Sequence, residues 1–210
     1  MKKQSSQLLR YNVDDVTVVS KRSCYQGFFK LEEYEVKHKR FDGGQSTLIK
    51  REIFERGDAV VLMPYDPVND TVVMIEQFRP GALRFGGTPW LLVFVAGMFG
   101  ENEQPTDVAI REAKEEANLD ITPENTTFIM KYLSSPGGMT EAIHLYAAIV
   151  DSSQTKAGEV FGLANENEDI LVHVLPFSDA IALLEEGKIT NAASVIGLQW
   201  LQLHRQSLGT

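Results

Sequence analysis

The stretch GMFGENEQPTDVAIREAKEEANL, residues 97–119, places the strongest constraint on how this chain can fold. It continues the apolar run WLLVFVAG, which predicts a buried strand, and its glycines predict a loop that leads into a helix over residues 106–117. On that helix Glu112, Glu115 and Glu116 fall within an arc of roughly 100°, because residues three and four apart share a face. Like charges at this spacing destabilise a helix, so the acidic face indicates either a solvated surface or a site for cations.

The rest of the helix fits this interpretation. Residues 105–107, Pro-Thr-Asp, predict its start as a cap with an acidic first turn. Ala113 and Ala117 point away from the acidic face and can pack on a sheet. Arg111 lies four residues before Glu115, which is the spacing at which an arginine holds a carboxylate in place.

Composition narrows the class of protein. The 210 residues suffice for one large domain or for a domain with a smaller companion, and the hydrophobic fraction of 43% supports a real core. The net charge of −9 argues against nucleic acid or an anionic membrane as the main partner. The single cysteine, Cys24, excludes an internal disulfide and is typical of a reducing cytoplasm. The N-terminal segment lacks the apolar region of a secretion signal, and the longest apolar run is about half of the roughly 20 residues that span a bilayer.

Apolar periodicity predicts an α+β fold. Residues 1–55 alternate apolar and polar positions and predict a small β domain with a hairpin turn at FDGGQS, while residues 56–210 predict a larger mixed domain. In the larger part, buried strands are expected in DAVVLMPYDPVNDTVVMIEQFRP (two strands joined by DPVND) and WLLVFVAG, and further strands in TFIMKYL, EAIHLYAAIV and ILVHVLP. Amphipathic helices are expected in FSDAIALLEEGK and NAASVIGLQWLQLHRQ, the last with a core stripe of Ala193, Ile196, Trp200 and Leu203.

The spacing of the charged residues in 97–119 resembles the signature of the Nudix hydrolases. A Gly is followed by Glu103, then by Arg111-Glu112, then by Glu115-Glu116, and every charged position of the pattern is met. The resemblance implies a Nudix fold, in which mixed β-sheets are sandwiched by helices, with a small N-terminal β domain. It extends over nearly the whole chain, and QGFFKLEEY, REIFERG, SPGG and GLANENEDI resemble the branch that hydrolyses ADP-ribose.

The resemblance implies roles for particular residues. Metal ligands are expected at the Ala96 carbonyl, Glu112, Glu116 and Glu168, which would hold two or three Mg²⁺ or Mn²⁺ ions per site. Glu166 is expected to activate water, with Glu115 and Arg111 in support. Substrate contacts are expected from Phe28, Phe29, Arg51, Glu52, Arg56, Arg79, Met98, Ser135, Pro136, Gly137 and Glu141.

These assignments make chemical sense, but each has a structural alternative. Phe28 and Phe29 can stack on a base or simply pack in a core. Arginines bind phosphate better than lysines do, yet an arginine is more often only solvated. The SPGG segment can shape a ribose pocket or be a plain turn. The acidic loop around Glu166 can close over metals or remain inert solvent-exposed chain.

Two positions depart from the family pattern. Asn118 replaces the closing Gly of the signature at a helix end where a positive φ is expected, and Asn is the next most tolerant residue there. Val93 stands where family members often carry Glu, which leaves the substrate preference open. All four carboxylates of the signature are present, so activity is expected to be retained.

The expected reaction is metal-dependent hydrolysis of ADP-ribose to AMP and ribose 5-phosphate by a cytoplasmic enzyme. The resemblance also implies a homodimer in which each active site borrows residues from the partner chain. Two alternatives stay open: a Nudix hydrolase for another nucleoside diphosphate sugar such as GDP-mannose, and a non-catalytic regulator that binds ADP-ribose.

Overall fold

The computed structural model describes residues 8–208, which form two compact units. One unit contains the chain up to Arg56 together with Ser135–Glu141, and the other contains Gly57–Ser134 and the chain from Ala142 onward. Residues 1–7, for which the sequence predicts no secretion signal, lie outside the described residues. Between residues 8 and 208 no helix combines the length and the apolar character needed to cross a membrane.

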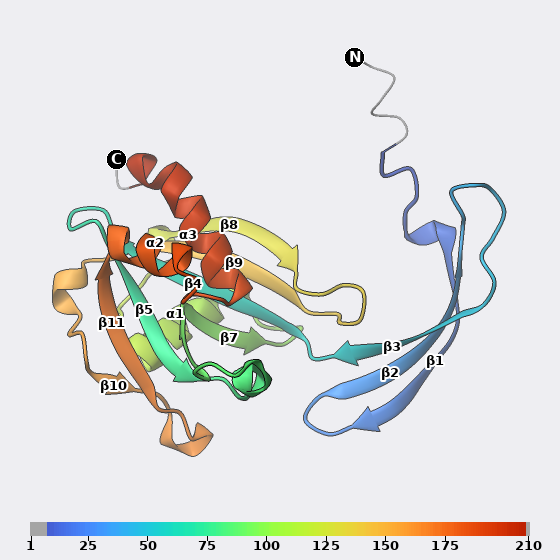
Figure 1. The fold of residues 1–210 in the computed structure, drawn as a ribbon, viewed down its shortest axis with the longest axis horizontal. Coiled ribbons are helices and arrows are strands. Elements are labelled where there is room, and N and C mark those ends of the chain that lie inside the picture. The colour runs from blue at the N-terminus through green and yellow to red at the C-terminus, as the bar shows by residue number, and fades with distance from the viewer. Residues whose placement is uncertain (1–7, 209–210) are drawn as a thin grey trace, which may run out of the picture. The chain divides into compact units, whose positions relative to one another are not determined.

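The first unit is a three-stranded antiparallel sheet (Figure 1). Its strands are β1 (Val16–Gln26), β2 (Lys30–His38) and β3 (Ile49–Glu55), in that order across the sheet. Every residue of β1 is exposed, and none of residues 8–56 is buried. Cross-strand ion pairs such as Lys21–Glu32, at 2.8 Å, decorate the sheet, so it is held by backbone pairing and surface contacts without a core of its own.

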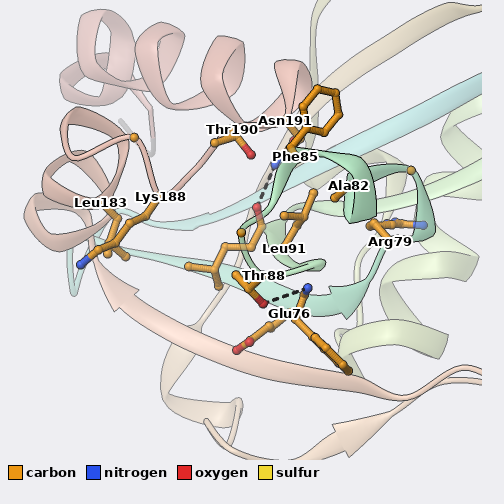
Figure 2. Close-up of a pocket in the computed structure, with 15 residues that line it drawn as sticks. Glu76, Arg79, Ala82, Phe85, Thr88, Leu91, Leu183, Lys188, Thr190 and Asn191 are labelled. Carbon is orange, nitrogen blue, oxygen red and sulfur yellow. Dashed lines mark hydrogen bonds between the residues drawn. The ribbon is translucent and has the colours of Figure 1, made fainter.

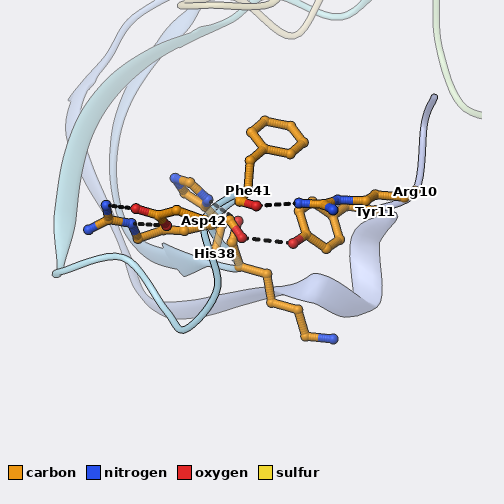
Figure 3. A network of polar contacts seen from close by, with 7 residues as sticks. Arg10, Tyr11, His38, Phe41 and Asp42 are labelled. Atoms are coloured by element: carbon orange, nitrogen blue, oxygen red, sulfur yellow. Dashed lines mark hydrogen bonds and ion pairs between the residues drawn. The ribbon is translucent and has the colours of Figure 1, made fainter. Parts of the chain in front are cut away.

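Two connections complete this unit. The predicted turn at FDGGQS lies between β2 and β3, with Gly43 and Gly44 at positive φ. Figure 3 shows the segment before β1 reaching this turn, where Tyr11 Oη donates to the Arg40 carbonyl at 2.7 Å and Tyr11 stacks on Phe41. These contacts tie the start of the described chain to the β2–β3 connection.

The second unit is built on an eight-stranded mixed sheet with helices on both faces (Figure 1). Its strands are β4 (Asp58–Asp66), β5 (Thr71–Phe78), β6 (Trp90–Val93), β7 (Val95–Phe99), β8 (Thr126–Leu133), β9 (Ala142–Ile149), β10 (Val160–Phe161) and β11 (Ile170–Pro176). The order is β10-β11-β5-β4-β9-β8, with β6 beside β5 and β7 beside β4. Only the β4–β9 pair is parallel, so the expected mixed α+β architecture is confirmed.

The helices cover the two faces. They are α1 (Pro105–Ala117), α2 (Phe177–Glu185) and α3 (Ala192–His204). Short 3-10 helices occur in the connections of this unit: η2 (Pro80–Phe85), η3 (Pro123–Asn125), η4 (Ser152–Gln154), η5 (Ala164–Glu166) and η6 (Arg205–Ser207). A further one, η1 (Val13–Asp15), precedes β1 in the first unit. Strand β5 shows the division: Val72 and Met74 pack under α2 and α3, while Val73 and Ile75 pack under α1. Alternation along β5 therefore divides its buried residues between two cores, one on each face of the sheet.

The predicted strand WLLVFVAG is divided in two, which corrects the expectation of a single strand. Strands β4 and β5 pair with each other only at Tyr65–Val72 and Asp66–Thr71, next to their connecting turn. Beyond those pairs the segment from Trp90 to Phe99 fills the space between them, first pairing with β5 and then with β4. The change of partner occurs at Phe94, whose N–H donates to Ser194 Oγ of α3 at 3.2 Å instead of joining a ladder.

Two helix predictions also need correction. Helix α1 begins at Pro105 after Gln104, whose side chain makes no capping hydrogen bond, so the expected polar cap at 105–107 is wrong. On α3 the expected core residues Ala193, Ile196 and Trp200 do pack against the core. Leu203, the fourth, is 80% exposed, because the fully buried face of α3 is formed by Ser194, Gly197, Leu198 and Leu201. The other end of α1 agrees with prediction: Asn118 closes it in the left-handed region, at φ 50° and ψ 34°.

The turn between β4 and β5 generates a stability prediction. Asp66 is 1% exposed, and its carboxylate accepts hydrogen bonds from Val68, Asn69 and Ser152. Burial alone raises the pKa of Asp66, but the hydrogen bonds from Asn69 and Ser152 outweigh burial and hold the pKa well below its usual value. Because an amide cannot accept all these bonds, we expect Asp66→Asn to lower the free energy of unfolding by about 3 kcal/mol.

Urea unfolding at neutral pH measures this change, and Asp120→Asn, which alters only an exposed ion pair with Lys114, is the control. Since the pKa is lowered in the folded state, the contribution is present above the unfolded value near 3.8 and is lost as the pH falls below it. Equal unfolding midpoints for the two variants would show that the Asp66 network contributes little.

Candidate active site

Helix α1 is fastened to the sheet through a buried carboxyl group. Glu116 is 2% exposed, and its Oε2 accepts a hydrogen bond from the Ala96 N–H of β7 at 3.0 Å. Val108, Ala109, Ala113 and Ala117 on the inner side of α1 pack into the core beneath it. The burial of Glu116 and the bond to Ala96 place two of the predicted metal ligands side by side.

Gly97 explains why the acidic signature begins with glycine. A Cβ atom at this position would overlap the side chain of Glu112, at its Oε1, Cγ and Cδ atoms. The Glu112 side chain therefore lies directly over the backbone of β7. Any larger residue at position 97 would displace a predicted metal ligand.

Arg111 holds two neighbouring carboxylates of α1 in place. Its Nη1 lies 2.8 Å from Glu115 Oε2, the i,i+4 pair that the sequence predicts, and its Nη2 lies 3.0 Å from Glu112 Oε1. One guanidinium thus orients two neighbouring carboxylates, which is a geometry that arginine supplies better than lysine.

Glu112 and Glu116 are unusually weak acids. Burial raises the pKa of Glu116 to about 8, against the Ala96 hydrogen bond and the Arg79 charge that lower it and with Glu112 and Glu168 adding to the increase. Burial also raises the pKa of Glu112 to about 6, which Arg111 opposes. Glu112 and Glu116 also repel each other, and the charges of Arg111 and Arg79 offset burial and this repulsion only in part.

The acidic loop between β10 and β11 is attached to α1. The Gly162 N–H donates to the Glu115 carbonyl at 3.3 Å, and Gly162 has a φ of 111° with no room for a Cβ beside Glu168. Glu168 is half-buried and accepts the Leu163 N–H at 3.1 Å, whereas Glu166 is exposed in η5. Gly162 was not foreseen as a functional residue, because a lone Gly before an acidic stretch predicts only a turn.

The donor set suits a hard divalent cation. Carboxylate and peptide oxygens are the ligands that Mg²⁺ prefers, and a nearby cation would favour the charged forms of Glu112 and Glu116, whose pKa burial raises. Within residues 8–208, however, no three His, Cys, Asp or Glu side chains converge on one point to hold a metal. Each expected carboxylate ligand instead bonds to a protein group: Glu112 to Arg111, Glu116 to Ala96 and Glu168 to Leu163.

The remaining expected contacts fall into two groups. Arg79 and Met98 lie in the second unit, with α1. The first unit carries Phe28, Phe29, Arg51, Glu52, Arg56, Ser135, Pro136, Gly137 and Glu141. Within that unit Phe28 is 89% exposed and meets Phe29 edge to face, so Phe28 does not pack in a core. Arg51 and Glu52 are exposed on β3.

The SPG segment is held against the end of β3. Phe54 donates its N–H to the Gly138 carbonyl at 2.8 Å and accepts the Thr140 N–H at 3.2 Å. Beside this pairing, Arg56 Nε lies 3.1 Å from the buried Glu141 carboxylate, and the Arg56 guanidinium stands over the Phe29 ring at 5.3 Å. Arg56, Glu141 and Phe29, which the sequence predicts separately, thus form one cluster.

A cavity of about 990 Å³ opens in the second unit between η2, β6 and the α2–α3 connection. Its walls are largely apolar, with Phe85, Trp90 and Leu91 among them, and Figure 2 shows Arg79 and Lys188 at opposite ends. The volume is in the range of small-molecule sites. Sequence reasoning found Arg79 but not the aromatic lining, because exposed aromatics in a Gly-rich loop give no periodic signal.

Comparison with known proteins agrees with the sequence resemblance. A model of the NUDIX domain family matches residues 55–196. The chain is 50% identical over 198 residues to an ADP-ribose pyrophosphatase of Escherichia coli strain K12, covering 94% of this chain and 93% of that protein. It is 34% identical over 180 residues to a GDP-mannose pyrophosphatase of Yersinia pestis, covering 85% and 87%. A crystal structure of an ADP compounds hydrolase shares the fold, with a TM-score of 0.69 at 19% identity over 95% of this chain and 98% of that one.

The acidity of Glu116 leads to a pH prediction for the metal-free protein. Its folded pKa of about 8 lies above the ordinary 4.5, so the folded state retains a proton that the unfolded state has lost. We therefore expect stability to decrease as the pH rises from about 5 to about 8. Glu116→Gln, which keeps the shape without the charge, should remove much of this dependence and stabilise the metal-free protein at pH 8 by a few kcal/mol.

Thermal unfolding in EDTA at pH 5 and pH 8 tests this, with the exposed Glu101→Gln as the control. If wild type and Glu116→Gln lose stability equally between the two pH values, the buried carboxyl is not the source.

Proposed function

The chain belongs to the Nudix family, and on that premise we propose that it hydrolyses the diphosphate of ADP-ribose to AMP and ribose 5-phosphate. The observation that carries the proposal is the group of neighbouring carboxyl groups on α1 and on the β10–β11 loop. Burial raises the pKa of two of them, Glu116 and Glu112. The substrate follows from the 50% identical relative, whose name specifies ADP-ribose.

We assign the cation site to the Ala96 carbonyl, Glu112, Glu116 and Glu168, holding two or three Mg²⁺ or Mn²⁺ ions. When bound, such ions neutralise the diphosphate and lower the pKa of a water molecule. Arg111 keeps the Glu112 carboxylate oriented through the 3.0 Å contact and supports Glu115 on its other nitrogen.

Glu166 serves as the general base in this proposal. Its exposed position in η5 leaves its carboxylate accessible to water, and the Gly162–Glu115 hydrogen bond anchors the loop that carries it. The water oxygen forms a bond to one phosphorus as the bridging P–O bond breaks, and the proton passes to Glu166. Arg56 and Arg79 bind the phosphate oxygens, while Met98, Glu141 and the Ser135–Gly137 turn contribute further contacts.

We assign the N-terminal part, residues 1–55, to dimerisation and to gripping the adenine end through Phe28, Phe29, Arg51 and Glu52, and residues 56–210 to catalysis. The exposed apolar residues of β1, including Val16, Val18 and Val19, support a homodimer, because a three-stranded sheet without a core needs a covering surface. In this proposal each active site uses residues of both chains. We place the enzyme in the cytoplasm, where the exposed Cys24 would remain reduced.

The two alternatives differ in what they require. A GDP-mannose hydrolase is favoured only by the 34% identical relative, against 50% for the ADP-ribose enzyme. A silent ADP-ribose-binding regulator has no need for all four signature carboxylates, and Glu103, Glu112, Glu115 and Glu116 are all present.

A substrate panel with Mg²⁺ distinguishes these functions. We expect kcat/KM for ADP-ribose to exceed that for GDP-mannose at least tenfold, on the order of what a few hydrogen bonds to the base can discriminate. Glu112→Gln should lower kcat/KM about 100-fold or more, because it removes a cation ligand, whereas the exposed Glu101→Gln should retain full activity. Similar rates on both nucleotides would overturn the assignment of ADP-ribose.

Light scattering tests the assembly. We expect a mass of twice the 23.4 kDa of one chain, and Val18→Lys should shift the population toward the monomer because it places a charge on the face assigned to the partner. Val160→Lys is the matched control, because Val160 is equally exposed but lies on β10 in the other unit. A wild-type mass of one chain would exclude the homodimer.

A further inference from the structure

Gln77 lies on the α1 face of the sheet and is not among the residues assigned to the metal or the substrate. On β5 the odd-numbered Val73 and Ile75 pack in the core under α1, and Gln77 continues that series toward the end of the strand. Its side chain is 9% exposed, the lowest exposure of any glutamine or asparagine among residues 8–208.

The side-chain carbonyl oxygen of Gln77 is buried and receives no hydrogen bond from the described residues. Such an acceptor destabilises the folded state, since in the unfolded chain it bonds to water. Native proteins retain few unsatisfied buried polar atoms, and those that persist often mark a site where a further group supplies the donor. An apolar residue of similar size would be the better choice at this position if packing alone mattered.

Strand register places Gln77 near residues of the candidate cation site. On one side its partner across the strand pair is Ile170 of β11, two residues after Glu168. Two residues along its own chain lies Arg79, whose charge lowers the pKa of the Glu116 carboxyl. Gln77 thus lies on the face of the sheet that α1 covers, opposite the start of β11 that follows Glu168.

We propose that Gln77 is a positioning residue whose Oε1 accepts a hydrogen bond from a water molecule on the cation held by Glu112, Glu116 and Glu168. Mg²⁺ keeps several waters when it binds proteins. A cation-bound water directs its lone pair at the metal and offers only O–H donors, so it matches an acceptor for which the protein supplies none. The inference rests on the proposed cation site, and it adds an uncharged acceptor to the four carboxylates of the signature.

Gln77→Leu tests this role, because packing and cation binding predict opposite effects. In EDTA the variant should unfold at a higher temperature than wild type, since it removes an unsatisfied acceptor. Its affinity for Mn²⁺, measured by calorimetry, should be about tenfold weaker, and the Mg²⁺ concentration for half-maximal hydrolysis should rise by a similar factor while KM for the nucleotide at saturating Mg²⁺ stays unchanged. Gln199→Leu, on the exposed side of α3, is the control and should alter neither the Mn²⁺ affinity nor the Mg²⁺ requirement.

The outcomes separate this inference from the proposed substrate. Unchanged Mn²⁺ affinity in Gln77→Leu would overturn it, and so would a lower unfolding temperature in EDTA, because that would mean the oxygen already has a donor in the metal-free protein. If wild type fails to hydrolyse ADP-ribose but Gln77→Leu still weakens Mn²⁺ binding, the substrate assignment fails while the role of Gln77 stands.

Discussion

The hydrogen bond from the Ala96 N–H to the Glu116 carboxyl connects the helix of the signature to the centre of the sheet. Burying a carboxyl group against a single peptide donor is unfavourable, and the neighbouring residues determine how the other carboxyl groups lie around it. Gly97 leaves room for the Glu112 side chain, Arg111 pairs with Glu112 and Glu115, and the Gly162 N–H bonds the acidic loop to the same helix. Burial of Glu112 and Glu116 between α1 and the sheet raises the pKa of both carboxyl groups.

Local chemistry explains which features the sequence predicts well. The positive φ of Asn118, the Arg111–Glu115 pair and the strands on either side of DPVND depend on neighbours a few residues away, and the structure has all of them. Features that depend on distant contacts were missed. The change of strand partner at Phe94 depends on Ser194, one hundred residues later, and the exposure of Leu203 depends on which face of α3 meets the sheet. For Gln77 the sequence holds only a weak signal: it is a polar residue in the phase of β5 that Val73 and Ile75 otherwise occupy.

The two units solve the problem of stability differently. The larger one encloses two apolar cores, one on each face of its sheet, and so can hold polar groups such as Asp66 and Glu116 in its interior. The N-terminal sheet has no residue buried between positions 8 and 56, and its cross-strand ion pairs join an exposed lysine or arginine to a partly exposed glutamate, so that solvent weakens them. Its valines and Phe28 therefore form exposed apolar surface, which sequence alternation could not distinguish from a buried hydrophobic face.

The separation of β4 from β5 has a consequence for the order of folding. A hairpin normally closes along its whole length from the turn, but this one can form only the two residue pairs nearest the turn. Away from the turn, the edges of β4 and β5 that face each other pair instead with the segment from Trp90 to Phe99, which comes later in the chain and carries Ala96 and Gly97. Completion of the central sheet therefore requires β4, β5 and the later segment together. We expect its formation to be slower than that of a simple hairpin, because its contacts are less local. The strand that completes it is the same strand on which Glu116 and Glu112 come to rest.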